Sequence, residues 1–338
     1  MARICVLGAG VAGLSSAVNI QSILPEADIT IIADQFNTES TSDGAAGNFG
    51  ILLGRTNADI CRLRCWTRDS FEWYHKICTS EDANIAGIHR THGYQLWRTE
   101  QPPPFHGSFD YGYRILSKSE LLKLPGNYKY GWELNTLMVE CRRYLPWLMK
   151  RFKEKGGKVI RKQLKNIVEI SGSYDVLVNC TGLGSRKLFD DKELVPIRGH
   201  TIRVKAPWIK TLFIADSDTY IYPGQDNVVL GGTRQRGEEK LDKDQRYYDD
   251  IMARCCSLVP SLKNAEVEKT WVGLRPWRPC VRLEVEMISV DGGRLPVVHN
   301  YGHGSDGVCI SWGCGVDAAN LVKQQLTETG SQRLVSKL

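Results

Sequence analysis

The sequence has no long hydrophobic segment, no dense block of charge and no internal repeat, and each absence excludes a class of protein. No apolar run approaches the roughly 18 residues that a membrane-spanning helix needs. Lysine and arginine are spread along the chain without aromatic interleaving, so a formal net charge of +6 does not predict nucleic-acid binding. No Ser/His/Asp order and no pair of acid–base carboxylates stands out. We therefore expect neither a membrane protein, nor a nucleic-acid-binding protein, nor a hydrolase with such a triad.

Cysteine is plentiful, but its pattern does not predict disulfides. The chain has 11 cysteines, an odd number, and Cys5, Cys180 and Cys309 lie inside apolar runs. No secretory leader precedes Cys5, so we expect reduced thiols in an intracellular compartment. The last residues, Ser336, Lys337 and Leu338, match the C-terminal peroxisomal address. They predict a peroxisomal matrix protein that the import receptor binds, and the sequence leaves open whether it forms a homo-oligomer.

What the sequence does have begins with a dinucleotide-binding pattern at the N-terminus. Ile4 to Leu7 is a short apolar strand, Gly8-x-Gly10-x-x-Gly13 opens a helix, and a second strand, DITIIAD, ends at Asp34. The glycines allow a tight turn, close approach of backbone N–H groups to a pyrophosphate, and close packing of helix on strand. Asp34 is placed to accept the ribose hydroxyls. The pattern predicts a bound dinucleotide without distinguishing NAD from FAD.

Two later glycine-rich stretches favour FAD. The segment DVLVNCTGLGS (175–185) is a buried strand that ends in glycines, as expected for a third strand of the same sheet. The segment NYGHGSDGVCISWG (300–313) is a glycine-rich loop followed by an apolar segment and a helix from about Val316. Flavin oxidases are built from such distant pieces, because a long and buried FAD needs contacts from several segments.

The length of 338 residues suggests about two domains. We expect an α/β fold in which a discontinuous Rossmann-like FAD-binding domain accompanies a substrate domain with a mixed or antiparallel β-sheet. The expected ranges are 1–52, 145–190 and 285–330 for the FAD-binding domain, 53–144 and 191–284 for the substrate domain, and 331–338 for the targeting tail.

Seven stretches resemble the D-amino-acid oxidase family of FAD oxidases in their order and approximate spacing. They are VLGAGVAGLSSA, TSDGAAG, VNCTGLGSR, YIYPG, LGGTRQRG, GLRPWRP and LPVVHNYGHGSDGVCISWG. The resemblance extends to about residue 325, and it implies FAD as the cofactor. The residues expected to contact FAD are Gly8, Ala9, Gly10, Gly13, Asp34, Gln35, Thr41, Ser42, Gly47, Asn48, Leu164, Gly304, Gly307, Val308 and Cys309.

The resemblance also implies a reaction. The substrate α-hydrogen would pass as a hydride to flavin N5, and the imino acid would hydrolyse to a 2-oxo acid and ammonia. Dioxygen would then reoxidise the flavin and yield hydrogen peroxide. The segment AAGNFGILLG departs from the residues that usually follow Ala-Ala-Gly in this family.

Arg275 is the expected anchor of the substrate. In TWVGLRPWRPC it lies between Gly273 and a proline-stiffened segment, so its guanidinium should be held in place. A planar fork of donors matches a carboxylate with two hydrogen bonds. The resemblance implies that Arg275 and the hydroxyl of Tyr220 bind the substrate α-carboxylate, whereas Arg278 is interpreted as a surface or sheet-edge cation.

Arg234 is expected to read the substrate side chain. The segment TYIYPGQDNVVLGGTR predicts a hairpin, and if even-numbered positions pair, Tyr220 and Arg234 share a face. Arginine at this position resembles the acidic-substrate branch of the family, and Ser305 in GHGSDG does so as well. Alternatively, Arg234 packs its stem on the sheet and points to water. The loop IADSD departs from the acidic branch, because related enzymes can supply a further arginine there.

The sequence therefore predicts an oxidase of acidic D-amino acids, with D-aspartate, D-glutamate and N-methyl-D-aspartate as substrates and dioxygen as oxidant. The alternatives are a neutral D-amino-acid oxidase, a glycine-type or sarcosine-type oxidase, and a flavin-binding protein without turnover. His299 and His303 have ligand-like spacing, but they lie beside the expected flavin segment and we expect no metal.

Overall fold

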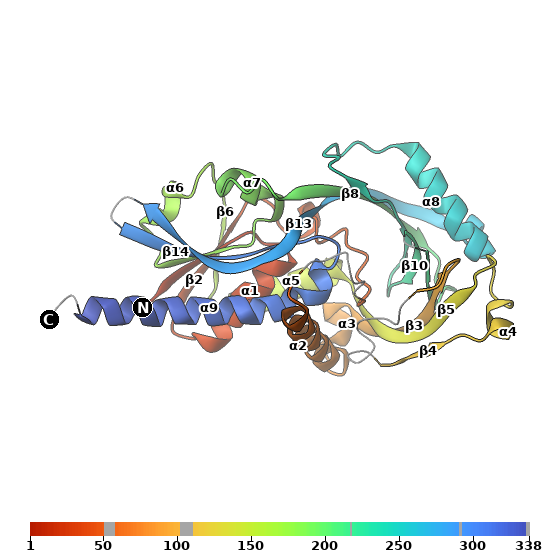
Figure 1. The fold of residues 1–338 in the computed structure, drawn as a ribbon, viewed down its shortest axis with the longest axis horizontal. Coiled ribbons are helices and arrows are strands. Elements are labelled where there is room, and N and C mark those ends of the chain that lie inside the picture. The colour runs from red at the N-terminus through yellow and green to blue at the C-terminus, as the bar shows by residue number, and fades with distance from the viewer. Residues whose placement is uncertain (51–57, 102–110, 217, 291–292, 336–338) are drawn as a thin grey trace.

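The computed structural model describes residues 1–50, 58–101, 111–216, 218–290 and 293–335 (Figure 1). The strands are β1 (Arg3–Leu7), β2 (Asp28–Ala33), β3 (Ile88–Trp97), β4 (Tyr113–Ile115), β5 (Tyr130–Val139), β6 (Lys158–Arg161), β7 (Val176–Asn179), β8 (Val195–Lys205), β9 (Thr211–Ala215), β10 (Thr219–Pro223), β11 (Val228–Gly231), β12 (Gln235–Arg236), β13 (Glu266–Val290) and β14 (Gly293–His303). The α-helices are α1 (Val11–Ile23), α2 (Ile60–Cys78), α3 (Ala83–Ala86), α4 (Lys118–Leu121), α5 (Cys141–Glu154), α6 (Val168–Ser171), α7 (Ser185–Leu188), α8 (Gln245–Leu258) and α9 (Gly307–Val335), with 3₁₀ turns η1 (Asn37–Glu39), η2 (Gly182–Gly184) and η3 (Pro260–Asn264).

The described strands form one sheet in the order β4-β5-β3-β9-β10-β11-β8-β13-β14-β7-β1-β2-β6, with β12 paired to β8. At one end, β14, β7, β1, β2 and β6 pair in parallel. The strand-turn-helix-strand unit predicted at the N-terminus is confirmed, as is the third strand, because Val6 of β1 lies between Ile31 of β2 and Val178 of β7. Strands buried on both faces read as continuous apolar runs, which is why the sequence shows them clearly.

Helices α1, α2, α5 and α9 pack into one hydrophobic core on a face of this parallel half. Figure 1 shows α9 running the length of that face with α1 beside it. The prediction that the last helix begins near Val316 is wrong, because α9 begins at Gly307. Its glycines are packing positions: a Cβ on Gly313 would lie 2.4 Å from Cα of Trp66 in α2, and one on Gly315 would lie 2.9 Å from the carbonyl carbon of Ser15 in α1.

The other end of the sheet is mostly antiparallel, with the parallel pair β3 and β9 inside it. Helix α8 covers one of its faces, where Ile202, Leu230 and Ile221 from neighbouring strands join Ile251 in a second core. The predicted combination of a Rossmann-like half and a mixed or antiparallel half is therefore confirmed.

Strand β13 connects the two halves of the sheet. Its first part pairs with β8 and its last part pairs with β14, and the register shifts between Trp277 and Arg282. The boundary placed near residue 285 falls inside this strand, and the boundary near 145 falls inside α5. The residues of the C-terminal address, 336–338, and residues 51–54 of the unusual loop segment lie outside the described residues.

All eleven cysteines lie among the described residues and all are free thiols, as the sequence predicts. Burial raises the pKa of Cys5 and Cys180 to about 12, so these thiols stay protonated in the core. Among the described residues, no helix combines the length and the apolar character that crossing a membrane would require.

Candidate active site

A cavity of about 670 Å³ extends from the glycine turn of the parallel half to the antiparallel half of the sheet. Ligand and cofactor sites in proteins commonly have volumes of about 300–1,000 Å³. The cavity is lined by all the residues expected to contact FAD except Gly13, and by Tyr220, Arg234, Arg275 and Ser305. The structure thus brings together side chains from five distant parts of the chain.

The glycine turn brings backbone to the cavity wall. Gly8 has a φ of +100°, and a Cβ there would lie 2.5 Å from the carbonyl oxygen of Cys180. A Cβ on Gly13 would lie 2.0 Å from the carbonyl oxygen of Gly8, so Gly13 serves the packing of helix on strand. The N–H of Val11 donates to Oγ of Ser42 at 3.1 Å. Helix α1 therefore begins at the cavity and directs the positive end of its dipole there, which suits a pyrophosphate.

Strand β2 ends at the part of the cavity that Asp34 and Gln35 line. Oδ2 of Asp34 accepts from Nε2 of Gln163 at 3.5 Å, and the Asp34 carbonyl oxygen accepts from Nη1 of Arg161 at 2.8 Å. Leu164 lines the same region from the segment after β6. The carboxylate keeps acceptor capacity on its second oxygen, as a ribose-binding residue requires.

Residues 47–50 and the first turn of α9 also line the cavity. Gly47 has a φ of +83°, and a Cβ there would lie 2.1 Å from the carbonyl oxygen of Val139. Sγ of Cys309 donates to the carbonyl oxygen of Asn48 at 3.3 Å and so ties this loop to the helix. Burial raises the pKa of Cys309 to about 12, which keeps the thiol neutral. The remaining expected residues here are Gly304, Gly307 and Val308.

The antiparallel half presents one row of side chains to the cavity. The strand register aligns Gln95, Ile214, Tyr220, Gly231, Thr201 and Trp271 across six neighbouring strands. Directly opposed residues of neighbouring strands project from the same face of a sheet. Every member of this row except Gly231 lines the cavity. One face of the sheet therefore forms the wall against which a substrate would lie.

The glycine pair at the end of β11 makes room for an aromatic ring. A Cβ on Gly231 would lie 2.0 Å from Cζ of Tyr220, and one on Gly232 would lie 2.8 Å from its Cε1. The Tyr220 ring stacks on Tyr222 with the centroids 4.5 Å apart. Burial raises the pKa of Tyr220, although the charge of Arg275 opposes the shift. The hydroxyl is therefore a neutral donor at physiological pH.

Arg275 lies on β13 against a glycine of the adjacent strand. A Cβ on Gly199 of β8 would lie 2.2 Å from Nη1 of Arg275, so a side chain at this position would displace the guanidinium. Nη1 donates to the carbonyl oxygen of Thr233 at 3.1 Å. Burial lowers the pKa of Arg275, and the neighbouring Tyr220 acts in the opposite direction. A guanidinium held at one nitrogen can direct its other donors into the cavity.

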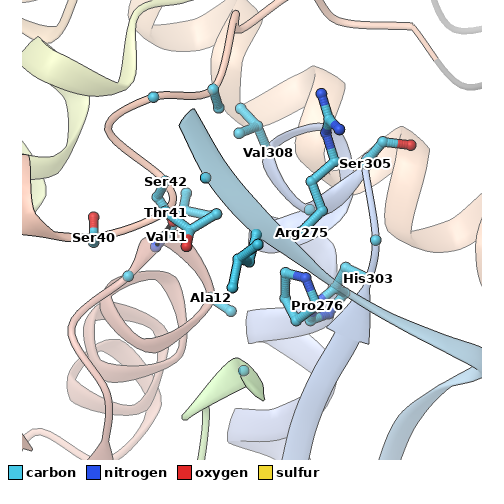
Figure 2. A pocket seen from close by; sticks show the side chains of 18 of the residues that line it. Val11, Ala12, Ser40, Thr41, Ser42, Arg275, Pro276, His303, Ser305 and Val308 are labelled. Atoms are coloured by element: carbon cyan, nitrogen blue, oxygen red, sulfur yellow. Dashed lines mark hydrogen bonds between the residues drawn. The ribbon is translucent and has the colours of Figure 1, made fainter. Parts of the chain in front are cut away.

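Ser305 lies half-buried in the loop between β14 and α9. Figure 2 shows Arg275 and Ser305 on one side of the pocket, and the loop that carries Thr41 and Ser42 on the other. Oγ of Ser305 donates to Oδ1 of Asp306 at 3.5 Å. This bond is long, so the hydroxyl can turn to another acceptor at little cost.

The hairpin register, which the sequence left open, does not pair even-numbered positions, yet Arg234 lines the cavity. Tyr220 pairs with Gly231, so even-numbered positions of β10 oppose odd-numbered positions of β11. Strand β11 ends at Gly231, and residues 232–234 leave the strand and its alternation of faces. Nε of Arg234 lies 3.5 Å from Oδ1 of Asp218, and the two side chains are 28% and 43% exposed. A carboxylate of the protein itself, that of Asp218, thus stands beside the Arg234 guanidinium.

Arg278 was interpreted as a surface or sheet-edge cation, and the structure places it on β13 with its side chain largely buried. Its side chain is 17% exposed, and its Nε lies 3.0 Å from Oδ2 of the buried Asp191. Nη2 of Arg278 donates to the carboxylate of Glu193. The residue therefore braces the segment before β8 and does not line the cavity.

His299 and His303 turn to different partners. Nε2 of His299 lies 2.9 Å from Oε2 of Glu286, and Nε2 of His303 lies 3.1 Å from Oδ1 of Asn300. Burial lowers the pKa of both imidazoles to about 4. Across the part of the chain that the structure describes, no three His, Cys, Asp or Glu side chains are grouped as metal ligands.

Two buried polar atoms on the cavity wall show what kind of ligand the site fits. Oδ1 of Asn48 and Oγ1 of Thr201 are buried without a hydrogen-bond partner among the described residues, and both residues line the cavity. Buried polar atoms are nearly always hydrogen-bonded in proteins. The cavity therefore fits a ligand whose edges carry hydrogen-bonding groups, as the isoalloxazine ring does.

Comparison with known proteins identifies the family. The model of the family described as "DAO: FAD dependent oxidoreductase" matches residues 3–321. The D-aspartate oxidase of Homo sapiens is 44% identical over 329 residues, which cover 96% of this chain and 95% of that protein. The chain belongs to this family of FAD dependent oxidoreductases. A D-amino acid oxidase of Dugesia ryukyuensis, another relative, is 33% identical over 330 residues, covering 96% of this chain and 98% of that protein.

The fold of this FAD dependent oxidoreductase is shared with solved structures. The crystal structure of glycine oxidase from Geobacillus kaustophilus superposes with a TM-score of 0.79 at 18% identity, covering 96% of this chain and 95% of that one. Family membership makes FAD the cofactor. The glycine turn at the start of α1, the acceptor at Asp34 and the unpaired atoms of Asn48 and Thr201 fit it.

Several residues that line the cavity were not predicted from the sequence. Gln95, Thr201 and Tyr222 line the cavity from three strands, and none stands in a glycine-rich motif. Tyr222 had a signal, because it lies two residues from Tyr220 and alternation puts both on one face. Gln95 and Thr201 become visible only through the pairing of strands far apart in sequence.

Proposed function

We propose that this chain catalyses the oxidative deamination of acidic D-amino acids, namely D-aspartate, D-glutamate and N-methyl-D-aspartate, with dioxygen as the oxidant. The observation that carries the proposal is that two arginines, Arg275 and Arg234, line the same cavity as the FAD-binding motif. Arginine is the side chain best suited to bind a carboxylate. Two such cations match an amino acid with two carboxylates, and the identity with human D-aspartate oxidase supports the same substrate class.

Each residue has a defined part in this proposal. Arg275 and the neutral hydroxyl of Tyr220 bind the α-carboxylate, and Arg234 binds the distal carboxylate. The hydroxyl of Ser305 donates to the distal carboxylate, and its carbonyl oxygen accepts from the substrate amine. The residues that hold FAD are Gly8, Ala9, Gly10, Asp34, Gln35, Thr41, Ser42, Gly47, Asn48, Leu164, Gly304, Gly307, Val308 and Cys309, with Gly13 setting the distance between helix and strand.

The protein contributes position and exclusion of water. Bound FAD would supply the oxidising chemistry, accepting the α-hydrogen as a hydride and reducing dioxygen to hydrogen peroxide. Arg275 and Arg234 fix the substrate at both ends, which lowers the entropy cost of aligning its α-hydrogen. The imine product takes up water and gives a 2-oxo acid and ammonia.

The proposal extends to the organisation of the chain and to its location. A discontinuous FAD-binding domain (1–52, 145–190, 285–330) and a substrate domain (53–144, 191–284) are supported by the parallel and antiparallel halves of the sheet. The address formed by residues 336–338 supports import into the peroxisome through the receptor that reads it. A peroxide-producing oxidase suits that compartment.

The decisive experiment measures hydrogen peroxide release from the FAD-loaded protein with D-aspartate and with D-alanine. A charge-assisted contact is worth about 1.5–3 kcal/mol, so Arg234→Ala should lower kcat/KM for D-aspartate about 10- to 100-fold. D-alanine oxidation should change little, because its side chain does not reach Arg234. Arg275→Leu should abolish turnover of both substrates while FAD stays bound. Unchanged turnover in Arg275→Leu, or a wild type that prefers D-alanine, contradicts the proposal.

A second candidate is favoured by one observation. Asp218 stands beside Arg234, and its negative charge offsets the positive charge of the guanidinium. This arrangement suits a neutral D-amino acid or a glycine-type or sarcosine-type substrate. If D-alanine or sarcosine outcompetes D-aspartate, oxidation of neutral substrates is the correct function. A flavin-binding protein without turnover is distinguished by anaerobic D-aspartate, which would leave the yellow colour of its bound flavin unbleached.

A further inference from the structure

A donor and an acceptor stand side by side at the wall of the cavity. The donor is the guanidinium of Arg234 and the acceptor is the carboxylate of Asp218, with Nε and Oδ1 3.5 Å apart. Both residues line the cavity. The separation exceeds that of a good charge-assisted hydrogen bond, and the Arg234 side chain has no other hydrogen bond or ion pair among the described residues. The pair is therefore loose enough to open for a ligand.

The carboxylate of Asp218 acts on the same groups as Arg234, with the opposite sign. Burial has the largest effect on the pKa of Arg275 and of Tyr220. Beyond burial, Arg234 lowers both pKa values and Asp218 raises both. A substrate carboxylate that approaches Arg234 would meet this negative charge as well, and like charges in a partly buried site repel.

A side-chain carboxamide would meet no such repulsion. A primary amide has one oxygen that accepts and an NH₂ group that donates. Its oxygen can accept from Arg234 while its NH₂ donates to Asp218, so both partners of the pair are satisfied at once. A carboxylate only accepts, so it can use Arg234 but not Asp218.

We propose that Asp218 is a specificity-determining residue of this cavity, whose carboxylate weakens the binding of a second substrate carboxylate and complements a substrate carboxamide. The inference rests on the proposed function, because it takes Arg234 as the residue that faces the substrate side chain. It adds D-amino acids with amide side chains to the substrate class. It also makes Asp218 the residue that sets the relative affinity for substrates with acid and with amide side chains.

The test uses two ligands that differ only at the distal group, succinate and its half-amide, succinamate. Neither has an amine, so neither can be oxidised, and the change in visible absorbance of the bound flavin reports binding without turnover. Asp218→Ala removes both the charge and the acceptor. Succinate should then bind about two- to fivefold more tightly, as expected for release of a partly exposed charge. Succinamate should bind about two- to tenfold more weakly, because it loses one hydrogen bond.

A second variant separates charge from hydrogen bonding. Asp218→Asn removes the charge but keeps an acceptor, so succinate should again bind more tightly, while succinamate should lose less affinity than in Asp218→Ala. Asp216→Asn is the matched control, because Asp216 lies two residues away, pairs with Arg98 and does not line the cavity. Its ratio of succinate to succinamate affinity should equal that of the wild type.

The outcomes separate this inference from the function on which it rests. If both ligands change affinity in the same direction in Asp218→Ala, or if their ratio stays constant, the role of Asp218 is refuted while D-aspartate oxidation stands. Weaker succinate binding in Asp218→Asn also refutes it and makes Asp218 a support for Arg234. If neither ligand perturbs the flavin of the wild type, the cavity does not take these ligands beside the flavin and the role of Asp218 falls, while peroxide release from D-aspartate still decides the proposed function.

Discussion

The two ends of the cavity are made from different parts of the polypeptide. At the cofactor end, glycine backbone contributes much of the wall, with Gly8, Gly10 and Gly47 and the first turn of α1 lining the cavity. At the substrate end the wall includes side chains that project from a sheet, with Arg275 and Tyr220 among them. A backbone wall fixes the shape of one large ligand, whereas a side-chain wall can change its preference by one substitution.

This difference predicts where mutations act. At the cofactor end an added methyl group should strongly weaken FAD binding, whereas a changed functional group should alter it little. The reason is that the fit depends on close approach of the main chain. At the substrate end the reverse should hold, because binding depends on the charge and direction of a few groups. Three experiments test this contrast, and they are ordered by the size of the effect.

The largest effect is expected from Gly13→Ala at the cofactor end. The new Cβ would lie 2.0 Å from the carbonyl oxygen of Gly8, so α1 must move away from β1 and the glycine turn must open. We expect the variant to lose bound FAD, measured as flavin absorbance after gel filtration, and to melt at a much lower temperature.

Gly172→Ala is the control for that experiment. A Cβ there would meet no atom within 4 Å, and its φ of −79° suits alanine, so FAD content should not change. Normal FAD retention in Gly13→Ala would show that the cofactor end tolerates side-chain bulk and would remove the contrast between the two ends.

An intermediate effect is expected where the two ends meet. Arg203 of β8 is 6% exposed, and it donates to the carbonyl oxygen of Asp43 at 3.3 Å and to Oδ1 of Asn227 at 3.2 Å. Asp43 belongs to the loop whose neighbours line the cofactor end. Arg203→Met leaves these buried acceptors unpaired, so we expect it to destabilise the protein by about 3 kcal/mol in urea unfolding and to weaken FAD binding.

Lys205→Met is the matched control on the same strand. Lys205 is exposed and pairs with Glu266 at 2.9 Å on the surface, so its loss should alter neither stability nor FAD affinity measurably. Equal behaviour of the two variants would mean that Arg203 does not join the ends of the cavity.

The smallest effect concerns pH. Burial lowers the pKa of His303 from 6.5 to about 4 in the folded protein. Between these values the unfolded chain takes up a proton that the folded protein does not, so stability is complete above pH 6.5 and falls as the pH drops toward 4. At pH 5 the loss from this residue should be about 2 kcal/mol relative to pH 7.

His303→Gln has no such titration, so its urea midpoint should fall less between pH 7 and pH 5 than that of the wild type. The measurement compares the two slopes in the holoenzyme. Parallel slopes would show that His303 is protonated equally in the folded and the unfolded states.

The cofactor end was largely predictable from the sequence, because its signals are local. The apolar run before Gly8, the spacing of the glycines and the position of Asp34 lie within one short segment. Even so, the start of α9 was missed, because Gly313 and Gly315 read as loop residues until the helices that press on them are known.

The substrate end was predictable only where a motif marked it. Arg275 and Tyr220 stand in distinctive segments, whereas Thr201 reaches the cavity through its pairing with Gly231 and Trp271. The hairpin register could not be decided from the sequence, since turn length and not apolar pattern sets it when both faces are buried. The partner of Arg234 was not foreseen, because nothing in the order of residues shows that Asp218 turns toward it.

The packing of α1 against α9 has a consequence for folding during protein synthesis. Helix α1 leaves the ribosome before α9, and the two helices pack against each other. A nascent chain must therefore expose part of the apolar surface of α1 until α9 has been made, which makes it prone to bind chaperones. The flavin likewise finds its complete binding site only after residues 304–309 have been made.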